Sequence, residues 1–187
     1  LGGHVGIWAA PPIDGEPPYQ HLLKQGLVDL IGFEPQTAAL AKLQRQKGEF
    51  ETYLPYAIGD GHPQILYVTA APGMTSTLRP DARLLALFNG FKQFGAVKKE
   101  VTLETRRLDD VEEISNVDFL KIDIQGGELN AFKHAERALT SATVIQTEVA
   151  FIPLYEGQPH YSDVHIALRS RGFVPHTFVD MRTTSLA

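Results

Sequence analysis

Short apolar runs alternate with longer amphipathic segments along most of the chain. A buried strand needs only a few consecutive apolar residues, whereas a helix repeats its apolar positions every three to four residues. On this basis we expect helices at Thr37–Gln46, Leu129–Leu139 and Ser162–Arg171, the last followed by Gly172 as a helix-ending residue, while the polar segment Tyr19–Gln25 is compatible with a helix. We expect strands at Val5–Ala10, Val28–Phe33, Tyr53–Ile58, Ile65–Thr69, Val97–Thr105, Val117–Ile124, Thr143–Val149 and Phe173–Val179.

This alternation predicts an α/β fold, because strand–helix–strand units form parallel pairs through right-handed crossovers. We therefore expect a mostly parallel sheet with helices on both faces. No linker, repeat or low-complexity tract interrupts residues 1–187, so we expect a single domain. The least regular stretch is Ala71–Ala96, which is typical either of a binding loop or of a helix at Arg83–Phe88 with its connections.

Composition and charge exclude several function classes. The net charge is −5 and no Lys/Arg-rich stripe is visible, so nucleic acid is not an expected partner. No apolar run is long enough to span a membrane, and Leu1–Ala10 lacks the basic flank of a signal peptide. The absence of cysteine excludes disulfides and thiolate chemistry and fits a cytoplasmic protein. Neither an HExxH nor an EF-hand pattern occurs, and we expect no metal site.

Acidic residues close most of the strands that could border a binding site. In an open α/β sheet, ligands bind beyond the carboxyl ends of the strands, near the point where the strand order reverses. The residues expected there are Ala9–Asp14, Glu34, Asp60, Asp123 and Glu148. Their carboxylates are suited to accept hydrogen bonds from ribose hydroxyls, an adenine amine or an ammonium group.

Glu34 is the sharpest of these candidates. An acidic residue at the end of the second strand, about twenty residues beyond the first strand–helix turn, is typical of a ribose-binding carboxylate. Its two oxygens can accept from two adjacent hydroxyls at once. The alternative is a carboxylate that is solvated or caps the next helix, since Pro35 suits an early helical position. For Asp60, contact with the adenine end and simple turn chemistry in Gly59-Asp60-Gly61 are compatible.

Several sequence blocks resemble the FkbM family of methyltransferases. The most specific is Leu120-Lys121-Ile122-Asp123-Ile124-Gln125-Gly126-Gly127-Glu128, which is similar to the family signature L-K-I-D-[VI]-[EQ]-G-x-E. The others follow in family order between Gly32 and Phe173: Gly32–Pro35, Ala57–Asp60, Thr105–Asp110, Ile145–Val149, Phe151–Tyr155 and Leu168–Phe173.

The resemblance implies a Rossmann-like class I methyltransferase fold with S-adenosylmethionine as methyl donor. It also implies O-methylation of a hydroxyl on a small metabolite or sugar as the activity. By analogy, Glu34 would hold the ribose, Asp60 with Ile58 the adenine, and Asp123 would face the methionine and the acceptor. The cofactor-binding residues expected in this way are Ala9, Ala10, Asp14, Glu34, Ile58, Gly59, Asp60, Asp123 and Gln125.

Two carboxylates are candidates for the catalytic base. A hydroxyl acceptor must lose a proton during methyl transfer, and a carboxylate can take it. Asp123 and Glu148 end strands expected to be neighbours in the sheet. The alternative for Glu148 is a structural hydrogen bond to the backbone turn in Phe151–Tyr155.

The chain departs from the family at its first strand–helix turn. The family has a D-x-G-A-N type motif there, whereas this chain has Ile7-Trp8-Ala9-Ala10-Pro11-Pro12. Alanine adds a methyl group where the backbone should approach the cofactor, and Pro11 removes an N–H donor. Either Asp14 or Glu16 replaces the missing groups or cofactor affinity is weak.

The carboxyl-terminal end also departs from the family. After Phe173–Val179 only Asp180–Ala187 remain, which is too short for the last antiparallel strand and its turn. With Leu at position 1, we expect a chain trimmed at both ends or a naturally reduced version. The sheet edge left open would favour a homodimer.

Two other functions stay open. The first is a non-catalytic Rossmann-like binding or scaffolding domain with a degenerate cofactor site. The second is an enzyme with another nucleotide cofactor such as NAD, against which the absence of a GxGxxG motif counts.

Overall fold

The computed structural model describes residues 5–8, 19–181 and 186. The chain divides into two compact units, and each is described by itself. The first unit comprises Leu1–His62, Glu104–Ile124 and Asn130–Thr147. The second comprises Pro63–Leu103, Gln125–Leu129 and Glu148–Ala187.

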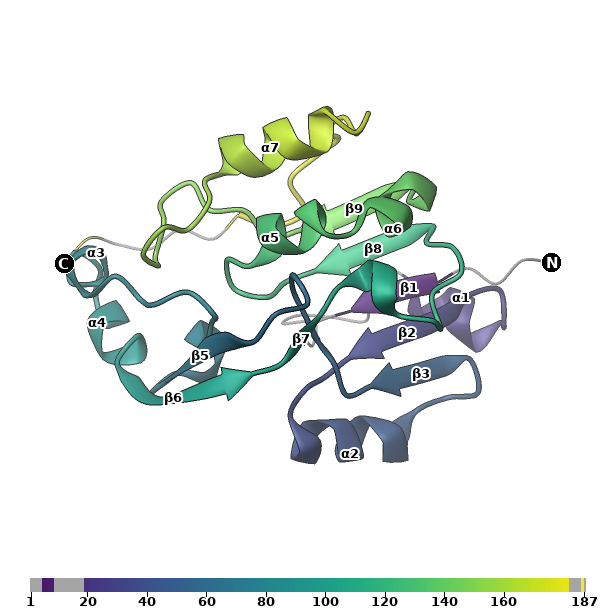
Figure 1. Cartoon of the computed structure of the whole chain (residues 1–187), viewed down its shortest axis with the longest axis horizontal. Coiled ribbons are helices and arrows are strands. Elements are labelled where there is room, and N and C mark those ends of the chain that lie inside the picture. The colour runs from purple at the N-terminus through teal and green to yellow at the C-terminus, as the bar shows by residue number, and fades with distance from the viewer. Residues whose placement is uncertain (1–4, 9–18, 182–185, 187) are drawn as a thin grey trace. The chain divides into compact units, whose positions relative to one another are not determined.

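The first unit is built on a sheet of five strands in the order β3-β2-β1-β8-β9 (Figure 1). These strands are β1 (Val5–Trp8), β2 (Asp29–Phe33), β3 (Glu51–Leu54), β8 (Phe119–Ile122) and β9 (Val144–Thr147). Every neighbouring pair is parallel. Because the strands are parallel, all their carboxyl ends lie at one edge of the sheet. The strand order runs in one direction from β1 to β3 and in the other from β8 to β9, so it reverses between β1 and β8. The α/β prediction is confirmed.

A second, small sheet in the same unit pairs β4 (Ala57–Ile58) with β7 (Thr105–Arg106) in parallel. The single strand predicted at Tyr53–Ile58 is therefore two strands that belong to different sheets. Pro55 lies between them, and proline has no N–H with which to continue a hydrogen-bonded ladder.

The helices of the first unit are α1 (Gln20–Lys24), α2 (Thr37–Gln46), the 3₁₀ turn η2 (Leu108–Asp110) and α6 (Glu136–Ser141), while α5 (Glu128–Lys133) begins in the second unit and ends in the first. Of these helices, α2 matches a predicted helix, whereas η2 was not predicted. The sheet and helices share an apolar core of Leu30, Ile31, Phe33, Leu108, Val111, Ile114, Val117, Leu120, Ile122, Phe132 and Leu139. Burial of these side chains supplies the main stabilisation of this unit.

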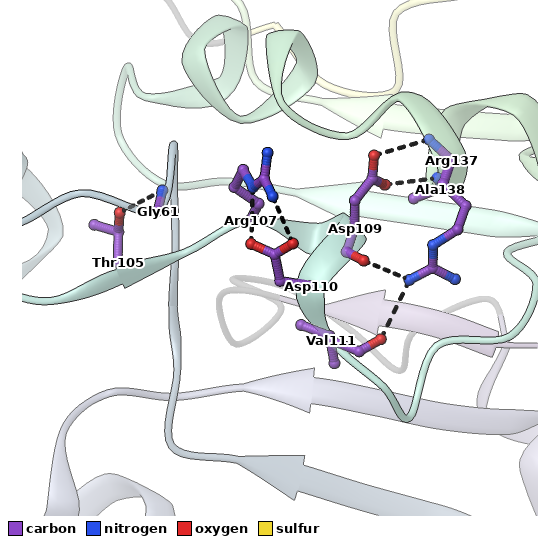
Figure 2. A network of polar contacts seen from close by, with 8 residues as sticks. All are labelled: Gly61, Thr105, Arg107, Asp109, Asp110, Val111, Arg137 and Ala138. Carbon is purple, nitrogen blue, oxygen red and sulfur yellow. Dashed lines mark hydrogen bonds and ion pairs between the residues drawn. The ribbon is translucent and has the colours of Figure 1, made fainter.

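The helix predicted at Leu129–Leu139 is broken into α5 and α6. Ala135 leaves helical geometry, with φ −129° and ψ 44°. The carboxylate of Asp109 accepts hydrogen bonds from the backbone N–H groups of Arg137 (2.9 Å) and Ala138 (3.0 Å), as Figure 2 shows. The Arg137 guanidinium in turn donates to the carbonyl oxygens of Asp109 (2.9 Å) and Val111 (3.3 Å). The carboxylate of Asp109, which is distant in sequence, therefore caps the first turn of α6. The periodicity of apolar residues within the helix does not reveal this contact.

Replacing Asp109 with alanine is expected to lower the free energy of unfolding by about 1–2 kcal/mol, as the loss of a helix cap does. Urea unfolding followed by circular dichroism measures this change. The adjacent Asp110 provides the control, because it only forms an exposed ion pair with Arg107 at 2.7 Å. Asp110→Ala should change stability far less. Equal losses in the two variants would contradict the capping role.

The second unit contains an antiparallel pair, β5 (Gln64–Thr69) with β6 (Val97–Leu103). Both strands were expected, but in a mostly parallel sheet; the pattern of apolar residues does not specify the partner or its direction. Between them lie the short helices η1 (Pro72–Met74), α3 (Ala82–Leu85) and α4 (Phe91–Phe94), so the helix predicted at Arg83–Phe88 is shorter than expected.

Helix α7 (Tyr161–Arg169) follows in this unit and begins one residue before the predicted Ser162. His160 is the N-cap residue, and its backbone N–H donates to the Asp163 carboxylate at 2.8 Å. Gly172, with φ of 94°, lies just beyond the helix as predicted. None of the helices in the described ranges combines the length and apolar character that a membrane span requires.

The strand predicted at Phe173–Val179 does not form. These residues carry no regular secondary structure, and Val174 and Val179 are 72% and 76% exposed. Their alternation of apolar residues is strand-like, but a strand needs a neighbour that pairs with its backbone N–H and C=O groups. The prediction of this strand was wrong.

Candidate functional site

Glu34 lies directly after β2, at the carboxyl edge of the five-stranded sheet. Its backbone N–H donates to the carbonyl of Leu54 at 3.0 Å, which fixes the residue against β3. One carboxylate oxygen, Oε1, accepts the backbone N–H of Gln36 at 2.8 Å, just before α2. Among the described residues Oε2 has no hydrogen-bond partner, and the side chain is half-buried. The hydrogen bond from Gln36 thus uses Oε1 and leaves Oε2 able to accept a hydrogen bond from a ligand hydroxyl.

Asp60 organises the turn after β4. Its Oδ1 accepts the backbone N–H of His62, and its Oδ2 accepts the side-chain N–H of Asn130, both at 3.0 Å. The Thr105 hydroxyl donates to the His62 carbonyl at 2.8 Å and accepts the Gly61 N–H at 3.1 Å, the contact drawn in Figure 2. These bonds hold the carboxylate rigidly. They also use much of its acceptor capacity, so an adenine contact in this turn would depend strongly on its backbone groups and on Ile58.

Close packing in the same turn explains why it contains Gly59. The backbone N–H of Gly59 donates to the Arg106 carbonyl at 3.0 Å. A Cβ at this position would lie 2.8 Å from the Cβ of Thr105, closer than real contacts allow. Ile58 is half-buried beside it and pairs with Arg106 in the β4–β7 sheet.

Asp123 follows β8 directly, and Glu148 follows β9. The residues before them, Ile122 and Thr147, are paired in register. Asp123 is half-buried, whereas Glu148 is exposed. Burial lowers the pKa of the Lys121 ammonium, and the negative charge of Asp123 opposes that shift. The carboxylate of Asp123 therefore lies close enough to Lys121 of β8 for their charges to attract.

The loop Gln125–Glu128, which belongs to the second unit, has an unusual backbone. Gln125 adopts a left-handed conformation with φ of 59°, and Gly126 follows with φ of 100°. Side chains disfavour the left-handed region by roughly 1 kcal/mol or more. Two hydrogen bonds hold the loop there: the Ser76 hydroxyl donates to the Gln125 carbonyl at 2.6 Å, and the Gly126 N–H donates to Glu128 Oε1 at 3.2 Å.

The loop brings polar side chains to a pocket of the second unit. Gln125 Nε2 donates to Glu148 Oε2 at 3.0 Å. Glu148 and the buried Glu128 both line the pocket, and an oxygen of one lies within 4.8 Å of an oxygen of the other. In the turn Phe151–Tyr155, the backbone N–H groups of Leu154 (2.7 Å) and Tyr155 (3.3 Å) donate to Gln158 Oε1.

Gly126 should tolerate no side chain. A Cβ there would lie 3.0 Å from Leu78 and 3.3 Å from Gln158, in a left-handed conformation. Gly126→Ala is expected to lower the free energy of unfolding by about 2 kcal/mol. Gly73→Ala is the control, because a Cβ at Gly73 meets nothing within 4 Å. Chemical denaturation of both variants measures the difference; equal stability of the two would contradict this account of the loop.

Three predicted cofactor residues, Ala9, Ala10 and Asp14, lie outside the described residues, and so does most of the Ile7–Pro12 turn. Of the remaining candidates, the structure places Glu34, Ile58, Gly59, Asp60 and Asp123 in the first unit. It places Gln125 and Glu148 in the second.

Comparison with protein families adds a finding that covers most of the chain. The family described as Methyltransferase FkbM domain matches residues 2–175. The chain belongs to the FkbM methyltransferase family. The predicted resemblance is therefore confirmed over nearly the whole sequence. No curated protein and no solved structure matches the chain.

Several residues that shape the site of this FkbM domain were not found from its sequence. Asn130 donates to Asp60, and Thr105 bonds the Gly61 N–H and the His62 carbonyl of the same turn. Ser76, Tyr155 and Gln158 support the Gln125 loop and the turn beside it. Tyr155 and Thr105 lie in sequence blocks that resemble the family, and this resemblance could have pointed to them. Ser76 lies in the irregular Ala71–Ala96 stretch, where nothing in the pattern of residues distinguishes it.

Proposed function

We propose that this FkbM domain is an S-adenosylmethionine-dependent methyltransferase with a Rossmann-like class I fold. We further propose that it transfers the methyl group to a hydroxyl of a small metabolite or sugar. The observation that carries the proposal is Glu34, which directly follows β2 in a parallel sheet whose strand order reverses between β1 and β8. An acidic residue at this place binds the ribose in nucleotide-binding α/β folds.

The described residues fit the ribose part of this cofactor. Glu34 Oε2 can accept a hydrogen bond from a ribose hydroxyl while Oε1 keeps its bond to the Gln36 N–H. A charged acceptor strengthens such a bond. When bound, S-adenosylmethionine supplies an electrophilic methyl group on its sulfonium.

The protein's own part in the reaction is to align the acceptor and to remove its proton. Alignment alone contributes much to a displacement of this kind, because it replaces a bimolecular encounter. Glu148 or Asp123 would accept the hydroxyl proton as the new bond to carbon forms. The carboxylates of Glu128 and Glu148 line the pocket of the second unit. Since like charges repel, they favour a neutral hydroxylated acceptor over an anionic one.

Isothermal calorimetry tests the cofactor, with S-adenosylmethionine and S-adenosylhomocysteine titrated into the folded chain. Micromolar binding of both supports the proposal. A screen of sugars and hydroxylated metabolites, read out as S-adenosylhomocysteine release, then tests the acceptor. A folded chain that binds neither compound would reject the enzyme and favour the non-catalytic binding or scaffolding domain.

A further inference from the structure

Asn130 of α5 contacts the turn after β4 through its side-chain amide. Its Nδ2 donates to Asp60 Oδ2 at 3.0 Å. An amide nitrogen carries two protons and an amide oxygen has two lone pairs, so this bond uses only part of the group. Among the described residues, Oδ1 and the second Nδ2 proton have no hydrogen-bond partner, and the residue is half-buried. Asn130 therefore has one donor and one acceptor left for a ligand.

The contact with Asp60 fixes which way round the amide of Asn130 lies. A carboxylate accepts hydrogen bonds and repels a carbonyl oxygen, so the amide nitrogen must face Asp60 and Oδ1 must face away from it. Asp60 is itself held by the turn, since its Oδ1 accepts the His62 N–H at 3.0 Å. Turning the amide over would replace a hydrogen bond with a repulsion. The remaining donor and acceptor are therefore set in place before any ligand binds.

The backbone that carries Asn130 is fixed as well. The next two residues of α5, Ala131 and Phe132, are 1% and 0% exposed, so this part of the helix is anchored in the core. One turn later, Nδ1 of His134 lies 2.9 Å from the Asn130 carbonyl oxygen. A group that is ordered before binding loses little conformational entropy when it meets a ligand. Helix α5 thus presents the amide as a preorganised binding group.

A donor beside an acceptor on one amide is the pattern that recognises adenine. Adenine presents its 6-amino group as a donor next to a ring nitrogen that accepts, and an asparagine side chain can bond both at once. Hypoxanthine has a carbonyl oxygen in place of the amino group, so it would set a second acceptor against Oδ1. The amide of Asn130 cannot turn over to suit that base without losing its bond to Asp60.

We propose that Asn130 binds the edge of the adenine ring and selects adenine over a 6-oxo purine. The proposal rests on the proposed function, in which the adenine of S-adenosylmethionine lies at the Asp60 turn. Oδ1 accepts from the 6-amino group, and the second Nδ2 proton goes to the neighbouring ring nitrogen. Asp60 orients the amide that makes these contacts.

Isothermal calorimetry with two ligands that differ only in the base tests this role. S-adenosylhomocysteine and its 6-oxo analogue, S-inosylhomocysteine, are each titrated into the full wild-type chain and into Asn130→Ala. The wild type should bind the adenine ligand about 10- to 100-fold more tightly, the discrimination expected from an amide that bonds a base twice. In Asn130→Ala this ratio should fall to about threefold or less, chiefly because the adenine ligand binds more weakly.

The ratio of the two affinities separates base recognition from a structural role. If Asn130 only tied α5 to the turn, its loss would weaken both ligands alike and leave the ratio unchanged. Asn116→Ala is the matched control, because it removes an exposed asparagine of the same unit, and it should keep the wild-type ratio. Alanine is a good helix former, so Asn130→Ala should stay folded, which urea unfolding checks.

Two results would overturn the role of Asn130 while leaving the cofactor in place. One is a wild-type chain that binds the two ligands equally, and the other is an Asn130→Ala chain that keeps the wild-type ratio. A wild-type chain that binds neither ligand rejects the proposed function itself.

Discussion

Glu34→Gln should weaken binding of S-adenosylmethionine by about 30- to 100-fold. The amide oxygen can still accept the Gln36 N–H that Oε1 accepts in the wild type, so the start of α2 is preserved. What is lost is the charged acceptor for the ribose hydroxyls, and hydrogen bonds to a charged group each contribute about 1.5–3 kcal/mol. Calorimetry of the variant and wild type at one ionic strength gives the ratio of the dissociation constants.

The matched control is Glu49→Gln, which makes the same charge change at an exposed position of the same unit. It should leave cofactor affinity unchanged within about twofold. Both variants should unfold at the same urea concentration as the wild type within error. An unaltered dissociation constant for Glu34→Gln in a chain that binds the cofactor would show that another residue holds the ribose.

Glu148→Gln is expected to lower kcat by at least about a hundredfold, the usual contribution of a general base. Glutamine keeps the size of the side chain and can still accept from Gln125 Nε2, but its oxygen cannot take up a proton at neutral pH. The cofactor dissociation constant should stay within about twofold. Since a base acts only when deprotonated, wild-type kcat should fall as the pH is lowered, and this dependence should vanish in the variant.

The comparison with Asp123→Asn separates the two candidate bases. Asp123 is expected to face the methionine as well as the acceptor, so its variant should weaken cofactor binding in addition to lowering kcat. Glu156→Gln is the control for charge, because it alters an exposed glutamate of the same unit as Glu148. A full loss of kcat in Asp123→Asn with near-normal turnover in Glu148→Gln would assign the base to Asp123.

The elements with the clearest periodicity could be predicted from sequence. The predicted helix Thr37–Gln46 matches α2 at both ends, and the apolar run Val117–Ile124 contains β8. Periodicity reports which residues face a core, but not which strand is the neighbour. Of the predicted strand Val97–Thr105, residues Val97–Leu103 therefore form an antiparallel strand beside β5, whereas Thr105 begins β7 in another sheet. Phe173–Val179 forms no strand. The break at Ala135 escaped prediction because a carboxylate from a distant segment causes it.

The candidate site was predictable where it follows from strand ends. Glu34, Asp123 and Glu148 all follow strands of the predicted sheet, because the residue after a buried strand must emerge at its edge. Their hydrogen-bond partners could not be predicted in the same way. Ser76 and Gln125 are far apart in sequence and meet only through the fold. The left-handed conformation of Gln125 could not be predicted either, because glutamine rarely adopts it.

The strand order has a consequence for how the protein is made on the ribosome. β1 precedes every other strand of this sheet in the sequence, yet it lies at the centre of the sheet between β2 and β8. Its pairing with β2 can form early, whereas the other half of the sheet must wait until β8 and β9 have been synthesised. The strands β5 and β6 are consecutive in the sequence, so they can pair as soon as β6 has been synthesised. During translation, β1 therefore keeps one edge unpaired until the segment between β2 and β8 has emerged, and an unpaired strand edge favours aggregation.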